Sequence, residues 1–379
     1  MNSRVSKIKF FSLLAVVAAG LIACGVGGDT GRLSLSLTDA ATDQYHAVYV
    51  TIREVAVHNE DDPEDSWTTV ATPNKTFNLL SLTNGVREEL ALADLTPGHY
   101  TQLRLIIGDQ KDNGVNILSQ THPFANYVVD ESDLVHELKV PSGVQTGVKI
   151  VQGFEINENR TTELILDFSA TRSVVVAGRS GRYLLKPTIK VLDTTLAAIL
   201  GGTVTKAADQ TVVEGALVSA QVYDALAADI KDQVVVHGST LSADTGAYKL
   251  FIAAGAYNLV AHKLGFAPSP AAITVEADTT PTQDFALTAV DSGTVAGTVA
   301  IAGANNETAV TLSFRQSVSL GGADVVIEVL AINVVNGAPY SVDLPAGLYS
   351  LVSSTLGKTT QAADVTVTAG ATTTLDIAF

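Results

Sequence analysis

The feature that most constrains the fold of this chain is a repeat in its C-terminal half. Residues 248–287 align without a gap on residues 340–379, and 16 of the 40 aligned pairs are identical. Each copy also opens with a Gly-Thr-Val segment, at Gly202 and at Gly297. We interpret the match as two copies of one domain, at 199–289 and 293–379, rather than as chance similarity between two β-rich stretches.

Apolar and polar residues alternate along much of the chain, a period that is typical of β-strands with one buried face. The runs at 33–37 and 103–107 follow this pattern, whereas a run that begins at Val48 changes phase after Ile52. The change predicts a β-bulge near Glu54. The sequence therefore predicts an all-β fold of tandem antiparallel β-sandwich domains with very little helix.

Helix is expected only in short pieces. The two segments that favour it are Ser132–Leu138 and Thr194–Leu200. Neither is long enough to form a helical domain, so the length of the chain must be filled by strands and turns.

A Gly-x-Tyr motif marks the core of each repeat, at Gly255-Ala-Tyr257 and at Gly347-Leu-Tyr349. We expect the glycine to turn the chain with a positive φ, and the tyrosine ring to cover the edge of the sandwich while its hydroxyl bonds to backbone or water. The pattern resembles carboxypeptidase regulatory-like and transthyretin-like repeats. That resemblance implies small seven-stranded sandwiches. A related Pro97-Gly-His-Tyr100 lies in the first part of the chain.

The first unit, which we place at 32–193, carries a broader resemblance. Its motifs occur in the following order: Gly31-Arg-Leu-Ser-Leu-Ser-Leu-Thr-Asp-Ala40, Val48-Tyr-Val-Thr-Ile52, Leu95-Thr-Pro-Gly-His-Tyr100, Val140-Pro-Ser-Gly143, Leu166-Asp-Phe168 and Tyr183-Leu-Leu-Lys-Pro187. Together they resemble the DUF4382 domain, a family of unknown function in exported bacterial and archaeal proteins. Ala41 and Ser169 depart from the family pattern, which has Pro and a second Asp there. The family supplies no catalytic residues to carry over.

The N-terminal segment predicts export. A basic start is followed by an apolar run, Phe10–Ile22, that is too short to span a bilayer as a helix and suits a signal peptide. The run ends in Leu21-Ile-Ala-Cys24, which resembles the lipobox of bacterial lipoproteins. The resemblance implies removal of residues 1–23 and acylation of Cys24, so that the protein is held at a membrane by its N-terminal lipid.

Residues 24–31 are expected to form a flexible tether between this lipid and the folded body. No Asp follows Cys24, and this favours the outer membrane over the inner membrane. Two alternatives stay open: an ordinary signal peptide or an uncleaved anchor, with Cys24 present by chance.

Charge and cysteine content exclude several classes of protein. The formal net charge is −16, and it becomes −19 when a signal peptide with three basic and no acidic residues is removed. A nucleic-acid binder that relies on a basic surface is therefore excluded. A single cysteine excludes a disulfide framework and a cysteine-based zinc site.

The motifs that usually carry catalysis or metal binding are missing from the sequence. The seven histidines form no His-x-His or His-Glu-x-x-His pair, and no Gly-x-Ser-x-Gly or phosphate-binding glycine loop occurs. We therefore predict no metal, no cofactor and no catalytic residue. Asp109–Gly114 has only a superficial likeness to a calcium loop, and a β-hairpin with an Asn113-Gly114 turn is the favoured interpretation.

Two other features have both a structural and a functional interpretation. The acidic run 59–65 is favoured as a solvated hairpin loop over a calcium site, and Trp67 is favoured as a partial core residue over a sugar-stacking platform. Asp167 and Arg172 bracket Phe168. If the two are buried together, charge-assisted bonds between them would lock a strand end, and this structural role is favoured over a catalytic one.

Three hypotheses for function follow. The leading one is a non-enzymatic, lipid-anchored envelope protein that acts as a scaffold or interaction module, with an envelope protein as its partner and limited contact between its domains. The second is a glycan-binding surface lipoprotein, and the third is an enzyme with a site built from scattered loop residues. The sequence does not identify the ligand.

Overall fold

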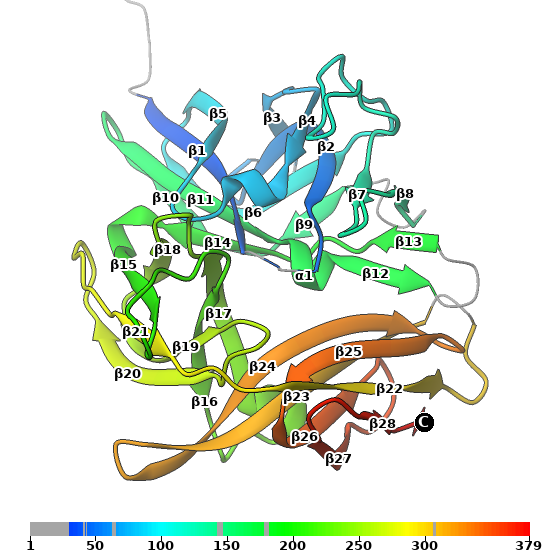
Figure 1. Cartoon of the computed structure of the whole chain (residues 1–379). Helices are drawn as coiled ribbons and strands as arrows, with labels where there is room; N and C mark the ends of the chain where they lie inside the picture. Colours follow the sequence, from blue (N-terminus) through cyan, green and yellow to red (C-terminus); the bar gives the residue numbers. More distant parts are fainter. Residues whose placement is uncertain are drawn as a thin grey trace, which may run out of the picture.

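The computed structural model describes residues 30–40, 42, 44–62, 66–141, 147–177, 182–305 and 308–379 (Figure 1). The predicted signal peptide, Cys24 and most of the predicted tether lie outside the described residues, as do positions 63–65 of the acidic run. None of the helices in the described part of the chain has the length and hydropathy needed to span a bilayer.

The first unit is built from fourteen strands, which enclose a large hydrophobic core and a smaller one around Tyr49 and Tyr127. One of its two sheets has the order β14-β11-β1-β5, and the other contains β10, β6, β2, β7, β8, β13 and β12, with β3, β4 and β9 paired at its side. The strands are β1 (Gly31–Ala40), β2 (Ala47–Asn59), β3 (Trp67–Ala71), β4 (Lys75–Asn78), β5 (Glu88–Leu95), β6 (Gly98–Ile107), β7 (Tyr127–Val129), β8 (Val135–Lys139), β9 (Val148–Ile150), β10 (Phe154–Ile156), β11 (Thr161–Ser169), β12 (Val174–Ala177), β13 (Arg182–Leu185) and β14 (Ile189–Asp193).

Alternation in the sequence corresponds to burial in this unit. Leu33, Leu35 and Leu37 of β1 are fully buried between the two sheets, as the period of two requires. The predicted bulge is also present, because the register of β2 against β6 shifts between Ile52 and Glu54. The all-β fold class is confirmed.

The expected helix at Ser132–Leu138 is wrong. The Asp130 carboxylate accepts hydrogen bonds from the backbone N–H groups of Ser132 and Leu134, both at 2.9 Å, and this tight turn leads directly into strand β8. Side-chain bonds of this kind compete with helix formation. At Thr194–Leu200, only η4 (Thr194–Leu196) is a 3-10 turn, and the remaining residues begin a strand. The other short helical pieces are η1 (Leu79–Leu82), α1 (Ala170–Ser173) and η5 (Ile230–Gln233).

The second and third units are sandwiches with related strand pairing. The second packs β18-β15-β21 against β17-β16-β19-β20, and the third packs β25-β22-β28, with β29 beside β22, against β24-β23-β26-β27. Strands of the second unit are β15 (Ala197–Lys206), β16 (Leu217–Tyr223), β17 (Val234–Leu241), β18 (Ala247–Ala253), β19 (Gly255–His262), β20 (Ser269–Val275) and β21 (Phe285–Leu287). Those of the third are β22 (Ser292–Ala300), β23 (Ala309–Leu320), β24 (Ala323–Val335), β25 (Pro339–Pro345), β26 (Gly347–Ser354), β27 (Gln361–Val367), β28 (Thr372–Thr374) and β29 (Ile377–Ala378).

The tyrosine of each Gly-x-Tyr motif makes the same contact in all three units. Its hydroxyl donates to the backbone carbonyl four residues earlier: Tyr100 to Thr96 at 3.0 Å, Tyr257 to Ala253 at 3.0 Å, and Tyr349 to Pro345 at 2.9 Å. Each ring is buried, so the hydroxyl satisfies a carbonyl at the corner of its sandwich.

The glycine of the motif has a different role from the expected one. Gly255 and Gly347 do not have a positive φ. A Cβ at Gly347 would instead lie 2.8 Å from Nε2 of Gln316, and a Cβ at Gly255 would lie 3.1 Å from the hydroxyl of Tyr257. A side chain at either position would require the neighbouring Gln316 or Tyr257 side chain to shift.

A second tyrosine contact is shared by the two C-terminal units. Tyr248 donates to the carbonyl of Gln283, and Tyr340 donates to the carbonyl of Leu375, both at 2.5 Å. The backbone at Gln283 approaches Gly202 so closely that a Cβ at Gly202 would lie 1.9 Å from the Gln283 carbonyl oxygen. Glycine at this position is therefore required by space, which accounts for the Gly-Thr-Val segment that opens each copy.

The three units are joined, contrary to the expected limited contact between them. Strand β12 of the first unit pairs in parallel with β24 of the third, through Val176 and Val334, so one fourteen-stranded sheet runs through both (Figure 1). The second unit packs against both of the others. No sequence pattern predicts the pairing of β12 with β24, because it joins strands about 160 residues apart.

Candidate functional site at the junction of the three units

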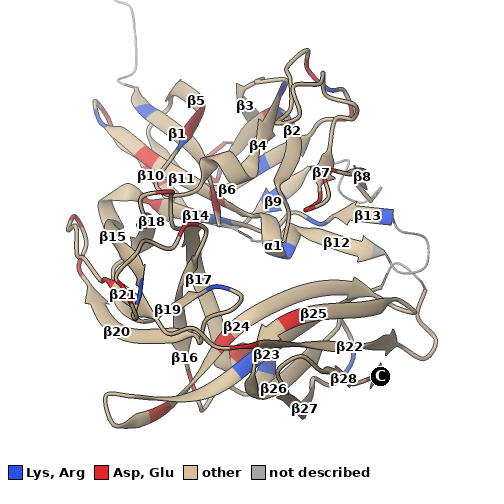
Figure 2. Ribbon diagram, viewed as in Figure 1, with Lys and Arg blue, Asp and Glu red and all other residues tan. Residues whose placement is uncertain are grey.

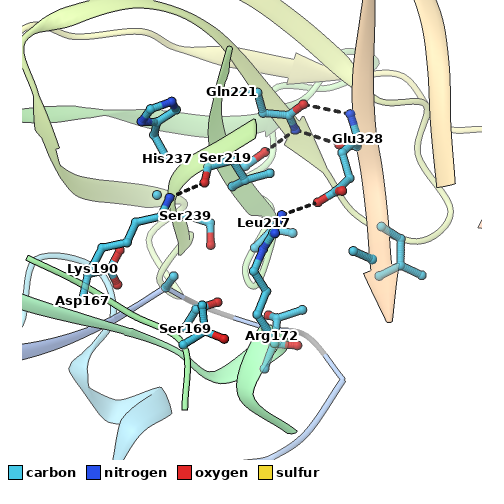
Figure 3. Close-up of a pocket in the computed structure, with 18 of the residues that line it drawn as sticks. Asp167, Ser169, Arg172, Lys190, Leu217, Ser219, Gln221, His237, Ser239 and Glu328 are labelled. Atoms are coloured by element: carbon cyan, nitrogen blue, oxygen red, sulfur yellow. Dashed lines mark hydrogen bonds and ion pairs between the residues drawn. The ribbon is translucent and has the colours of Figure 1, made fainter. Parts of the chain in front are cut away.

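A cavity of about 70 Å³ lies where the three units meet (Figure 3). Its lining mixes apolar and polar groups and comes from all three: β1, β11, α1 and β14 of the first unit, β16 and β17 of the second, and β24 of the third. The labelled side chains around it are Asp167, Ser169, Arg172, Lys190, Leu217, Ser219, Gln221, His237, Ser239 and Glu328.

Glu328 is contacted by side chains from every unit. Its carboxylate accepts from Nη2 of Arg172 at 3.3 Å and from the hydroxyl of Ser313 at 2.6 Å. The carboxylate is mostly buried, so these bonds offset the cost of removing it from water. Arg315, only 3% exposed, extends the contact to the second unit by donating to the carbonyls of Ile230 and Lys231, at 2.7 and 2.8 Å.

Gln221 binds the backbone of Glu328 as a neighbouring strand would. Its amide Nε2 donates to the Glu328 carbonyl at 2.7 Å, and its Oε1 accepts from the Glu328 N–H at 2.8 Å. The side chain is 1% exposed. The two bonds satisfy both polar groups of a backbone segment that would otherwise be unpaired at the junction.

Two β-bulges shape the cavity. In β24 the register against β23 shifts between Leu330 and Glu328, which leaves Val329 as the extra residue. In β17 the register against β16 shifts in the same way and leaves His237 as the extra residue. Bulges turn side chains away from the regular alternation, and both of these residues line the cavity.

Asp167 and Lys190 face each other across strands β11 and β14. Burial raises the pKa of Asp167 to about 7, although the charge of Lys190 and a hydrogen bond from the Ala40 backbone oppose the increase. Burial likewise lowers the pKa of Lys190, whose Nζ donates to the carbonyl of Val236 in the second unit. Oδ1 of Asp167 is buried and accepts no hydrogen bond.

His237 of β17 lines the cavity from the second unit. Burial, and then the charge of Lys190, lowers its pKa, so the ring is neutral at neutral pH. The ring packs edge-on against Tyr257, with 5.5 Å between the ring centres. Ser219 accepts from the amide of Gln221 at 2.8 Å, and this bond within β16 helps to position the Gln221 side chain. The arrangement is suited to holding the units together around a small cavity.

The predicted ion pair between Asp167 and Arg172 is wrong. Asp167 lies on β11 and Arg172 on the one-turn helix α1, where Arg172 reaches Glu328 of the third unit while Asp167 faces Lys190. Both residues lie at the junction, but each has a partner that is distant in sequence.

The predicted hairpin at Asn113-Gly114 is also wrong, because this pair lies in a long loop between β6 and β7. Asp112 holds the loop: its Oδ1 accepts from the Gly114 N–H at 2.8 Å, and its Oδ2 accepts from the Thr76 N–H at 2.9 Å. His122 lies 3.4 Å from Asp112 and 2.7 Å from the hydroxyl of Tyr127. Within the described residues, no three His, Cys, Asp or Glu side chains are grouped closely enough to hold a metal.

Trp67 is half-buried but is not part of the hydrophobic core of its unit. The Arg104 guanidinium lies over its ring at 4.4 Å from the ring centre, and Nζ of Lys149 lies at 5.7 Å. His58 packs against the ring at 5.4 Å. The indole is therefore covered by cationic side chains, an arrangement that neither sequence interpretation anticipated.

Basic and acidic residues are scattered over all three units, as Figure 2 shows. The tyrosines are largely internal, since seven of the ten are buried. The other three, Tyr45, Tyr183 and Tyr223, are half-buried, and the rings of Tyr45 and Tyr183 pack edge to face with 6.4 Å between their centres.

The chain was compared with known proteins. Residues 30–187 match a family model described as a domain of unknown function (DUF4382), and residues 199–288 match the carboxypeptidase regulatory-like domain. No curated protein matches the chain.

Similar solved structures share little sequence with it. They include the Bacillus anthracis TIE protein (14% identity, 93% of this chain and 50% of that chain, TM-score 0.21) and a streptococcal ancillary pilin (10%, 92% and 98%, 0.20). A leucine-rich repeat protein from Bacteroides thetaiotaomicron is a third (17%, 48% and 26%, 0.23). The chain spans half the length of the first of these and about a quarter of the last, and at these TM-scores the likeness carries no argument about function. The matched families establish that this chain contains a DUF4382 domain followed by a carboxypeptidase regulatory-like domain.

Proposed function

We propose that this protein is a non-enzymatic scaffold or interaction module of the bacterial cell envelope, anchored in the outer membrane by lipid on Cys24. We further propose that residues 293–379 are a second regulatory-like repeat. The equivalent contacts of Tyr257 and Tyr349, and of Tyr248 and Tyr340, support the repeat.

The observation that carries the scaffold proposal is the junction at Glu328. Polar side chains that a catalytic site would direct toward a substrate are here directed toward backbone and side chains of another unit. Gln221 binds the Glu328 backbone, and Arg315 binds two carbonyls of the second unit. A body joined in this way holds its outer surfaces at fixed positions, which suits a protein that presents or spaces other envelope components.

Lipid anchoring is tested by metabolic labelling with a fatty-acid probe in wild type and Cys24→Ala. We expect label only in wild type, together with recovery of wild type in the outer-membrane fraction and release of the variant into the soluble fraction. Equal labelling and equal fractionation of the two proteins would contradict the proposal.

The partner is tested by chemical crosslinking in intact cells, followed by capture of the full chain. The proposal predicts that discrete envelope proteins are recovered with wild type and are reduced with Cys24→Ala, which no longer resides at the membrane. Recovery of polysaccharide alone would instead support glycan binding. In that case Trp67→Ala should abolish the recovery, whereas Tyr223→Ala, at a half-buried aromatic residue of the second unit, should not.

A further inference from the structure

A groove of about 670 Å³ lies between the first and second units. Its walls come from β9 and β14 of the first unit and from β17, β18 and β19 of the second, and it shares only Thr188, Lys190 and His237 with the junction cavity. Pockets that hold small organic ligands have volumes of roughly 300–1,000 Å³, so the groove has the size of a binding site.

Most side chains in the groove are apolar, and two of them are exposed to solvent. Val151 is 81% exposed and Val235 is 40% exposed. The repeat offers a comparison, because Ile327 lies two residues before the bulge of β24 as Val235 lies two residues before the bulge of β17, and Ile327 is fully buried. The second unit therefore leaves open an apolar position that the third unit covers, and an open apolar site of this kind suits an apolar ligand.

The charged groups of the groove all have one sign. Lys149 and Lys190 line it, and no described Asp or Glu does, although the chain has 39 acidic and only 23 basic residues. Asp167, which faces Lys190 across the strand pair, lines the junction cavity and not the groove. This lining is complementary to a ligand that is both apolar and anionic.

Lys190 and His237 form the polar part of the groove (Figure 3). Nζ of Lys190 donates to the carbonyl of Val236, next to His237, and this bond uses one of its three protons. Nζ of Lys149 instead lies 5.7 Å from the ring centre of Trp67. Lys190 is therefore the cation that is placed to receive an anionic head group.

We propose that the groove binds a long-chain fatty acid, whose carboxylate bonds to Lys190 and whose alkyl chain packs on Val235 and Val151. One ammonium group suits one negative charge, and an apolar wall suits a chain without further polar groups. The ligand contacts both units. The inference goes beyond the scaffold function and does not rest on the lipid proposed on Cys24.

The test titrates the chain from Gly25, which contains every described residue, with the fluorescent fatty acid cis-parinaric acid. We expect saturable binding of one molecule per chain. Val151→Asp and Val235→Asp place a carboxylate in the groove at exposed positions and should weaken binding by about tenfold or more. Val115→Asp and Val212→Asp make the same exchange at positions that are 65% and 48% exposed outside the groove, and they should bind as wild type does.

Competition for the probe tests the head group. Palmitate should displace the probe at a concentration about tenfold or more below that of its methyl ester, which carries no charge for Lys190. Equal displacement by the acid and the ester, or equal binding by all four Asp variants, would overturn the proposal. Stronger displacement by lysophosphatidylglycerol than by palmitate would overturn it in favour of a phospholipid.

Discussion

Replacing Gln221 with leucine tests whether the junction holds the units together. Leucine has a similar size and is apolar, but it cannot bond to the Glu328 N–H and carbonyl, which lie 2.8 and 2.7 Å from the amide. Each backbone group left buried and unpaired costs about 1–3 kcal/mol. The apolar side chain returns about 1–2 kcal/mol through its own burial, so we expect a net loss of about 2–4 kcal/mol.

Scanning calorimetry provides the assay. For three units that unfold together, the loss predicts a fall in Tm of about 3–5 °C for Gln221→Leu. It also predicts that unfolding of the second unit separates from that of the other two, because the two hydrogen bonds of Gln221 join the second unit to the third. Gln152→Leu, the same exchange at an exposed position between β9 and β10, should change stability by less than about 0.5 kcal/mol. A Tm for Gln221→Leu within about 1 °C of wild type would refute the reasoning.

Three further predictions concern single positions. The pKa of Asp167 is raised to about 7, so the folded state holds a proton that the unfolded state releases above about pH 4. The free energy of unfolding should therefore fall by up to about 4 kcal/mol between about pH 4 and 7. A series of Tm measurements against pH should show this fall in wild type and a weaker fall in Asp167→Asn. Tyr349→Phe removes the hydroxyl bond at the corner of the third sandwich and should cost about 1 kcal/mol in urea unfolding. Gly202→Ala places a Cβ 1.9 Å from the Gln283 oxygen and should destabilise by about 3 kcal/mol or more, whereas Gly201→Ala, whose nearest contact is 3.4 Å, should cost far less in the same unfolding assay.

Local sequence patterns predicted the features that depend on neighbouring residues. Alternation identified strands β1, β2 and β6 of the first unit, and the change of phase after Ile52 located the bulge. The Gly-x-Tyr motif identified the corner of each sandwich, although Gly255 and Gly347 do not have the positive φ that we expected. These features depend on which face of a strand each side chain occupies, and the spacing of residues along the strand determines that face.

The junction could not be predicted in the same way. Gln221 and Glu328 are 107 residues apart, and neither belongs to a motif that indicates a partner. Asp167 and Arg172 were recognised as a structural pair because they are near in sequence, yet their partners come from other strands. The bulge that directs His237 into the cavity depends on pairing between β16 and β17, which the sequence does not display as a change of phase.

Small-angle X-ray scattering on the soluble chain that begins at Gly25 tests most directly whether the three units form one body. A single compact body of this length predicts a radius of gyration of about 20 Å. Three sandwiches linked in series without a common junction would give about 30 Å or more, and that result would contradict the account.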